Sequence, residues 1–239
     1  MVGFSGVLNE VKTKAVSYNE GLRRYMLGVY NYMSVALGIS AFVAFFMAKT
    51  GLSLAIMSSP LGWLIAFSPL ILSIVMSVKL TTAKISTIKG LYFAYSVLMG
   101  MSLSTLFYVY SGVDITRIFL ITACMFGGMS IYGYTTQKDL SGLGSMFIMV
   151  VWGLLIASIV NIFLHSSGLS FGISCISVLV FTGLVAFDTQ NLKRTYYAVC
   201  HDTNLATRLG IFGALQLYID FIAIFVHLLQ LFGNASRRD

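Results

Sequence analysis

The chain has 239 residues, of which 58% are hydrophobic and only 10% are charged. Soluble domains carry roughly 25% charged residues, so this composition excludes a soluble enzyme and a disordered chain. The net charge of +7 needs no nucleic acid to explain it, because the basic loops of a membrane protein lie beside anionic lipid. The three cysteines show neither CxxC nor Cys/His metal spacing, so no disulfide framework or zinc site is expected.

Stretches without charged residues predict seven transmembrane helices in a lipid bilayer, and hence an all-α polytopic fold. A membrane span needs about 20 apolar residues. The fifth stretch is long enough for two spans divided at 165–168, and the sixth is interrupted only by Asp220. In chain order the stretches are 25–48, 50–78, 90–113, 118–137, 140–187 and 209–236. The expected organisation is an N-terminal tail (1–24), a single transmembrane domain (25–234) and a short C-terminal tail (235–239).

The distribution of basic residues predicts the topology. Eleven of the 15 Lys and Arg residues lie in the N-terminal tail and in the alternate loops 79–89, 135–142 and 191–210. Basic loops stay in the cytoplasm. The N-terminus is therefore expected in the cytoplasm and the C-terminus outside it.

Small residues in two spans predict close helix packing. The third span carries Ser96, Gly100 and Ser104 at four-residue spacing, and the fourth carries Gly127 and Gly128. Residues of this size let helix backbones approach one another in a membrane. We expect helix contacts at both places.

Two acidic residues lie inside predicted spans. Asp220 is in the middle of the seventh span, and Asp188 is near the cytoplasmic end of the sixth. An ionisable residue inside a bilayer is costly and marks a functional site. These two aspartates are therefore the principal candidate site residues.

A polar stripe follows one face of the seventh span. Its members recur every three or four residues and are Gly213, Gln216, Asp220, Ala223, His227 and Gln230. A polar stripe in a membrane helix must turn inward, so this helix is expected inside the bundle. His227 lies about two turns from Asp220 and either relays protons or hydrogen-bonds within the bundle.

Contact between Asp188 and Asp220 would create a proton-sensitive pair. Two adjacent carboxylates in a low dielectric medium cannot both ionise cheaply, so they share a proton and titrate as a unit. They could also bind a hard cation such as Ca²⁺ transiently. Counted from the loop 191–210, Asp188 is shallower than Asp220 by up to about two helical turns. Contact therefore requires the sixth helix to extend beyond the bilayer, or the seventh to begin in the loop.

Catalytic motifs are missing from the sequence, and we expect no enzyme. There is no HExxH zinc motif, and Cys200, His201 and Asp202 are adjacent in the chain, which is not how a nucleophile meets its base. An intramembrane aspartyl protease would also carry two aspartates on its sixth and seventh spans. That class has Gly-x-Gly-Asp at the second aspartate, whereas Tyr218 and Ile219 precede Asp220 here.

The chain resembles the Bax inhibitor-1 family of seven-span membrane proteins, most closely its bacterial inner-membrane branch. The matching segments are 21–26 (GLRRYM), 98–104 (LMGMSLS), 125–136 (MFGGMSIYGYTT), 138–141 (KDLS), 187–190 (FDTQ) and 217–221 (LYIDF). The resemblance implies six helices around a central seventh. It also implies a pH-sensitive calcium leak without a resident cofactor, whose two sensing aspartates correspond to Asp188 and Asp220.

Two further roles are implied by the same resemblance. A basic residue ending the second span can compete for the first aspartate, and Lys79 has that position, although lysine cannot form the bidentate pair of arginine. Bacterial relatives have been linked to a membrane-bound ATP-dependent protease. The alternative function is therefore regulation of a protease or stress response through protein contacts of the basic N-terminal tail.

Overall fold

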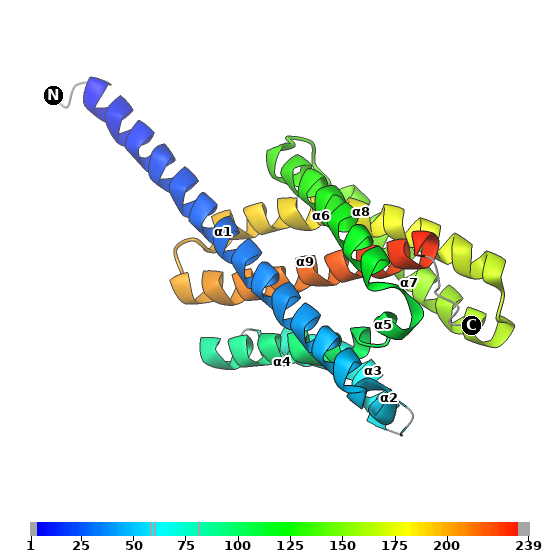
Figure 1. The fold of residues 1–239 in the computed structure, drawn as a ribbon. Coiled ribbons are helices and arrows are strands. Elements are labelled where there is room, and N and C mark those ends of the chain that lie inside the picture. The colour runs from blue at the N-terminus through cyan, green and yellow to red at the C-terminus, as the bar shows by residue number, and fades with distance from the viewer. Residues whose placement is uncertain (1–3, 58, 60, 81, 234–239) are drawn as a thin grey trace.

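The computed structural model describes residues 4–57, 59, 61–80 and 82–233, so the predicted C-terminal tail lies outside the described residues (Figure 1). No strand occurs among the described residues. The helices are α1 (Phe4–Thr50), α2 (Leu52–Met57), α3 (Leu61–Lys79), α4 (Ile85–Leu103), α5 (Leu106–Val109), α6 (Gly112–Thr135), α7 (Ser141–Leu164), α8 (Ser167–Val199) and α9 (Thr203–Phe232).

Seven segments are long and apolar enough to cross a membrane, which confirms the seven predicted spans. They are α1 from Asn19 onward, α3, α4 together with α5, α6, α7, α8 and α9. The turn between α7 and α8 lies within the predicted division. His165 ends α7 with a left-handed backbone (φ 49°), and the Ser166 side chain caps α8 by accepting a hydrogen bond from the Leu169 N–H.

Helix α9 occupies the middle of the bundle, as the inward polar stripe predicted. In its apolar segment 67% of the residues are buried, against 0% in α7. Helix α9 packs against α1, α4, α6 and α8, whereas α7 packs mainly on α8. Figure 1 shows α9 running between α8 and α4.

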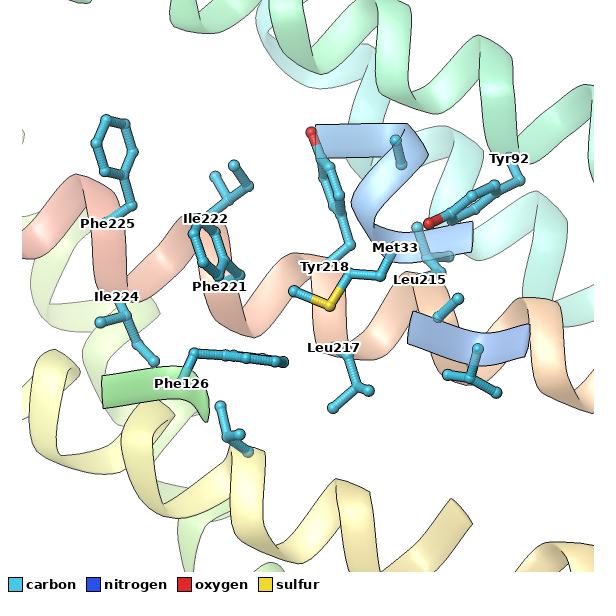
Figure 2. Packing of buried hydrophobic residues seen from close by; sticks show 14 of the residues in the cluster. Met33, Tyr92, Phe126, Leu215, Leu217, Tyr218, Phe221, Ile222, Ile224 and Phe225 are labelled. Carbon is cyan, nitrogen blue, oxygen red and sulfur yellow. The ribbon is translucent and has the colours of Figure 1, made fainter. Parts of the chain in front are cut away.

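The core forms where three surrounding helices direct large side chains toward α9. Figure 2 shows Met33 of α1, Tyr92 of α4 and Phe126 of α6 converging on α9, where Tyr218 and Phe221 meet them. The Phe126 and Phe221 rings are 5.7 Å apart between centroids in an edge-to-face arrangement. Dispersion contacts of this kind associate helices in lipid, where there is no hydrophobic drive between them.

The prediction of a loop over residues 191–210 is wrong. Helix α8 continues to Val199 and α9 begins at Thr203, so only residues 200–202 connect them. Charged residues in this segment predicted a loop, but charged residues also occur in a helix that continues beyond the membrane-spanning length. A helix that leaves the bilayer can carry charged residues in water, as α8 does with Lys193 and Arg194.

The small residues confirm one predicted helix contact and contradict the other. A Cβ atom added at Gly100 would lie 2.6 Å from the Ser40 carbonyl oxygen, so α4 and α1 do approach closely there. At Gly127 and Gly128 an added Cβ would meet no atom within 4 Å. The close contact of α6 with α8 is instead at Gly133, because the buried face of α6 runs through residues 126, 130 and 133, and Gly127 and Gly128 lie outside it.

The basic regions gather at one end of the bundle. Tyr25 of α1 contacts Tyr196 of α8 with ring centroids 5.2 Å apart, and Arg194 pairs with Asp139 of the α6–α7 loop at 2.8 Å. Helix α1 starts at Phe4 without a break, and its N-terminal part projects beyond the other helices (Figure 1). The direction in which this end faces stays a prediction from the positive-inside rule.

Candidate functional site

Asp188 of α8 and Asp220 of α9 lie together inside the bundle. Their exposed fractions are 8% and 4%, and both line one cavity of about 410 Å³. Their carboxyl groups are close enough to form a side-chain hydrogen bond with each other. Either of the two expected routes would allow this contact, and the helices show both extensions, since α8 continues to Val199 and α9 begins at Thr203 within the expected loop.

The cavity lies between α7, α8 and α9. Its walls are largely apolar, with Val151 and Trp152 of α7 and Leu184 of α8 among them. Besides the two aspartates, its polar lining comes from the amides of Gln216 on α9 and Asn191 on α8. Gln216 was predicted from the polar stripe. Asn191 was missed, although it follows Asp188 by three residues and so shares its helix face.

A hydrogen bond between the two carboxyl groups would require a proton. One carboxyl must donate an O–H to the other, because two carboxylates can only accept. Oδ2 of Asp220 is buried and receives no hydrogen bond from any residue in the described part of the chain. The arrangement can therefore hold a proton between the two carboxyl groups.

Polar side chains next to Asp188 connect α8 to its neighbours. Thr189 lies 3.2 Å from the hydroxyl of Ser130 on α6, and Ser130 in turn bonds Tyr30 of α1. Gln190 is buried and donates from its amide to the Lys138 carbonyl at 2.7 Å. It also accepts from the Leu140 N–H at 3.0 Å.

These contacts were not predicted from the sequence. The run of three polar residues at 188–190 in an apolar helix was an available signal, but the partners are 50 or more residues away in the chain. Such long-range pairing depends on the rotation of each helix, which a single sequence does not specify.

His227 belongs to a different polar cluster. Its Nδ1 lies 3.1 Å from the side-chain oxygen of Gln230, which accepts a hydrogen bond from Ser174 of α8 at 2.8 Å. His227 is not among the described residues that line the aspartate cavity. Of the two roles expected for His227, this arrangement corresponds to hydrogen bonding within the bundle. A proton relay through His227 stays a prediction.

Lys79 lies away from the two aspartates. It is an exposed residue at the last turn of α3. The cavity walls come from α7, α8 and α9, so the structure does not bring Lys79 to Asp188. A latch between them stays a prediction.

The site offers few ligands for a resident metal ion. Within the described ranges, no three His, Cys, Asp or Glu residues cluster as a metal site. Calcium takes six to eight oxygen ligands, and the cavity supplies two carboxylates and two amides. The donor set suits brief contact with a hard, partly hydrated cation better than tight binding.

A second charged group lies outside the membrane-spanning segments, in the α6–α7 loop. The backbone N–H of Ser141 and then the Arg194 guanidinium donate hydrogen bonds to Asp139, and they lower the pKa of this carboxyl to about 2. Asp139 is therefore ionised at any physiological pH and cannot act as a proton sensor there.

Comparison with known proteins agrees with this architecture. The family model described as "Inhibitor of apoptosis-promoting Bax1" matches residues 22–237. The chain is 42% identical over 228 residues to an uncharacterized protein of Rickettsia prowazekii, covering 95% of each chain. It is 41% identical over 217 residues to the inner membrane protein YbhL of Escherichia coli, covering 90% of this chain and 93% of YbhL. The chain therefore belongs to the Bax inhibitor-1 family of multi-pass membrane proteins.

Proposed function

We propose that the protein is a pH-sensitive cation leak in a bacterial inner membrane, with Asp188 and Asp220 as its proton sensor. The observation that carries the proposal is the contact between two buried carboxyl groups at the wall of one cavity. The location follows from the seven apolar helices and from the E. coli relative, which is an inner membrane protein.

The proposed gate is a change in the packing of α9 against α8. With one proton on the pair, the hydrogen bond between Asp188 and Asp220 holds the two helices together. Without it, two like charges face each other in a medium of low dielectric, and their repulsion favours separation. A ligand or proton can shift such an equilibrium only by its different affinity for the two packings, and the shared proton supplies that difference.

The ion is proposed to be Ca²⁺, passing as a transported species. Oxygen ligands suit hard cations, and Asp188, Asp220, Asn191 and Gln216 supply oxygens along the cavity. Beyond Asp220 the buried residues of α9 are apolar, among them Ile224 and Phe225. Apolar constrictions block ions by excluding water, so in this proposal the described packing is the closed state of the leak.

The test is Ca²⁺ flux into proteoliposomes measured from about pH 6 to about pH 8. The wild type is compared with the double variant Asp188→Asn/Asp220→Asn, in which neither side chain can ionise. We expect flux that depends on pH in the wild type and flux independent of pH in the double variant.

The matched control is Asp202→Asn. Asp202 caps α9 by accepting from the Leu205 N–H at 2.9 Å, and asparagine caps a helix equally well. This control makes the same chemical change outside the cavity and should keep the wild-type profile. A pH dependence that survives in the double variant would refute the sensor, and no flux above empty liposomes would refute the leak.

A second candidate function is regulation of a membrane-bound protease or a stress response through α1. Its support is the projection of the N-terminal part of α1 beyond the bundle (Figure 1), in a segment that contains Lys12 and Lys14. Affinity capture with the full chain and with a variant lacking residues 2–20 tests this function. Loss of a specific partner with flux unchanged would support it, and capture of no partner by either protein would refute it.

A further inference from the structure

A long groove lies between α1 and α6, and none of the described residues that line it also lines the aspartate cavity. Three cavities line up along it, of about 580, 410 and 410 Å³. The first two share Tyr30 and Phe126, and the second and third share Leu37, Ala41 and Phe119. The three cavities therefore follow one another along the membrane-spanning length of both helices, and the Tyr30 side chain crosses the groove beside the first cavity to bond Ser130 of α6.

The floor of this α1–α6 groove is the central helix. Phe221 of α9 lines the middle cavity, and Ile222 and Phe225 line the cavity beyond it. Both α1 and α6 pack against α9, which holds them on either side of the groove. A molecule lying in the groove would thus contact core residues of α9 as well as the outer helices.

The groove stays open because small residues line its walls. Gly38 of α1 lines the middle cavity, and Gly127 of α6 lines the first. An added Cβ would meet no atom within 4 Å at either position. The space that small residues usually leave for a neighbouring helix is therefore unfilled by this chain.

Charge distinguishes the two ends of the groove. Arg23 lines the first cavity, at the basic end of the bundle. Tyr134 lines this cavity too. The ammonium group of Lys193 lies 5.5 Å from the centre of the Tyr134 ring, and it donates a hydrogen bond to the backbone carbonyl oxygen of Tyr134 at 3.2 Å. Among the described residues that line the third cavity, at the far end, none is charged.

We propose that the α1–α6 groove binds an anionic phospholipid, with one acyl chain along the apolar walls and the phosphate-bearing headgroup against Arg23 and Lys193. Its occupant must be apolar along the membrane depth and negatively charged at one end, and an anionic lipid has both properties. Basic sites between transmembrane helices recognise such headgroups. This binding does not depend on the proposed ion leak.

The test is native mass spectrometry of the full-length protein in detergent, after removal of endogenous lipid. Phosphatidylglycerol and phosphatidylcholine with identical acyl chains are titrated separately. The wild type should retain one phosphatidylglycerol in preference to phosphatidylcholine. Arg23→Gln should weaken phosphatidylglycerol binding about fivefold, since one cation near an anionic headgroup contributes on the order of that factor.

Two variants fill the groove from opposite walls, Gly38→Leu and Gly127→Leu. Both should remove the retained phosphatidylglycerol. The matched controls are Gly128→Leu, the neighbouring position where an added side chain also meets open space, and Arg24→Gln, whose side chain lines a different cavity. Both controls should bind as the wild type does, and all variants should keep the wild-type melting temperature.

Three results would overturn the proposal. Equal retention of the two lipids by the wild type would refute headgroup recognition. Unchanged phosphatidylglycerol binding in both Gly38→Leu and Gly127→Leu would refute the location. A dimer without bound lipid that either variant dissociates would show that a second copy of the chain fills the groove.

Discussion

The amide of Gln190 should contribute strongly to stability, because it holds the α6–α7 loop against α8. In Gln190→Ala the buried N–H of Leu140 loses its acceptor and the Lys138 carbonyl loses its donor. An unsatisfied buried N–H costs about 1–3 kcal/mol and an ordinary hydrogen bond contributes about 1 kcal/mol, so the expected loss is about 2–4 kcal/mol. For a chain of this size that loss lowers the melting temperature by roughly 5–10 °C.

Thermal unfolding of the purified protein in detergent, followed by circular dichroism at fixed pH, measures this effect. Gln137→Ala is the matched control, since it makes the same change at an exposed position in the same loop. The control should unfold within about 2 °C of the wild type, because exposed substitutions change stability by less than about 0.5 kcal/mol. Equal melting temperatures for the two variants would show that the hydrogen bonds of Gln190 contribute nothing to stability.

Two other substitutions test the packing and the loop electrostatics. Gly133→Ala would place a Cβ 2.8 Å from Cα of Ala186, so it should destabilise the protein by about 1–3 kcal/mol in the same melting assay, whereas Gly128→Ala faces open space and should not. Asp139→Asn removes a carboxylate with a lowered pKa, so the stabilisation that this carboxylate contributes changes with pH only in the acid range. That stabilisation is complete above about pH 4 and is lost as the pH falls toward 2. The variant should therefore leave the pH profile of Ca²⁺ flux near neutrality unchanged, and an altered profile would contradict this.

The membrane spans were predictable because the bilayer imposes a strong constraint. A helix must be apolar over its whole crossing, so stretches without charge locate each span. The inward orientation of α9 was predictable for the same reason, since lipid does not solvate the Gln216 and Asp220 side chains. The ends of the helices were less predictable. Beyond the bilayer the constraint disappears, and α8 runs on through Lys193 and Arg194 into what was expected to be a loop.

The pairing of helix faces could not be predicted from the sequence. Gly127 and Gly133 look alike in the chain, yet only Gly133 contacts α8, because the rotation of α6 is decided by packing across the whole bundle. The contact between Asp188 and Asp220 was anticipated as a possibility, and its geometry depends on the length of α8 and on the short linker. The hydrogen bonds of Gln190 to the α6–α7 loop and the α1–α6 groove both join segments that are distant in the chain, so no local sequence pattern predicts them.

Asp188 and Asp220 are proposed to share a proton, and infrared spectroscopy of the carboxyl C=O stretch detects that proton. Difference spectra are recorded between about pH 6 and about pH 8 for the wild type, for Asp188→Asn, for Asp220→Asn and for the Asp202→Asn control. A protonated-carboxyl band that changes with pH is expected in the wild type and in the control. Each cavity variant should lose that change, because the proton belongs to the pair. A pH-dependent band that persists unaltered in both Asp188→Asn and Asp220→Asn would show that these two carboxyl groups do not share a proton.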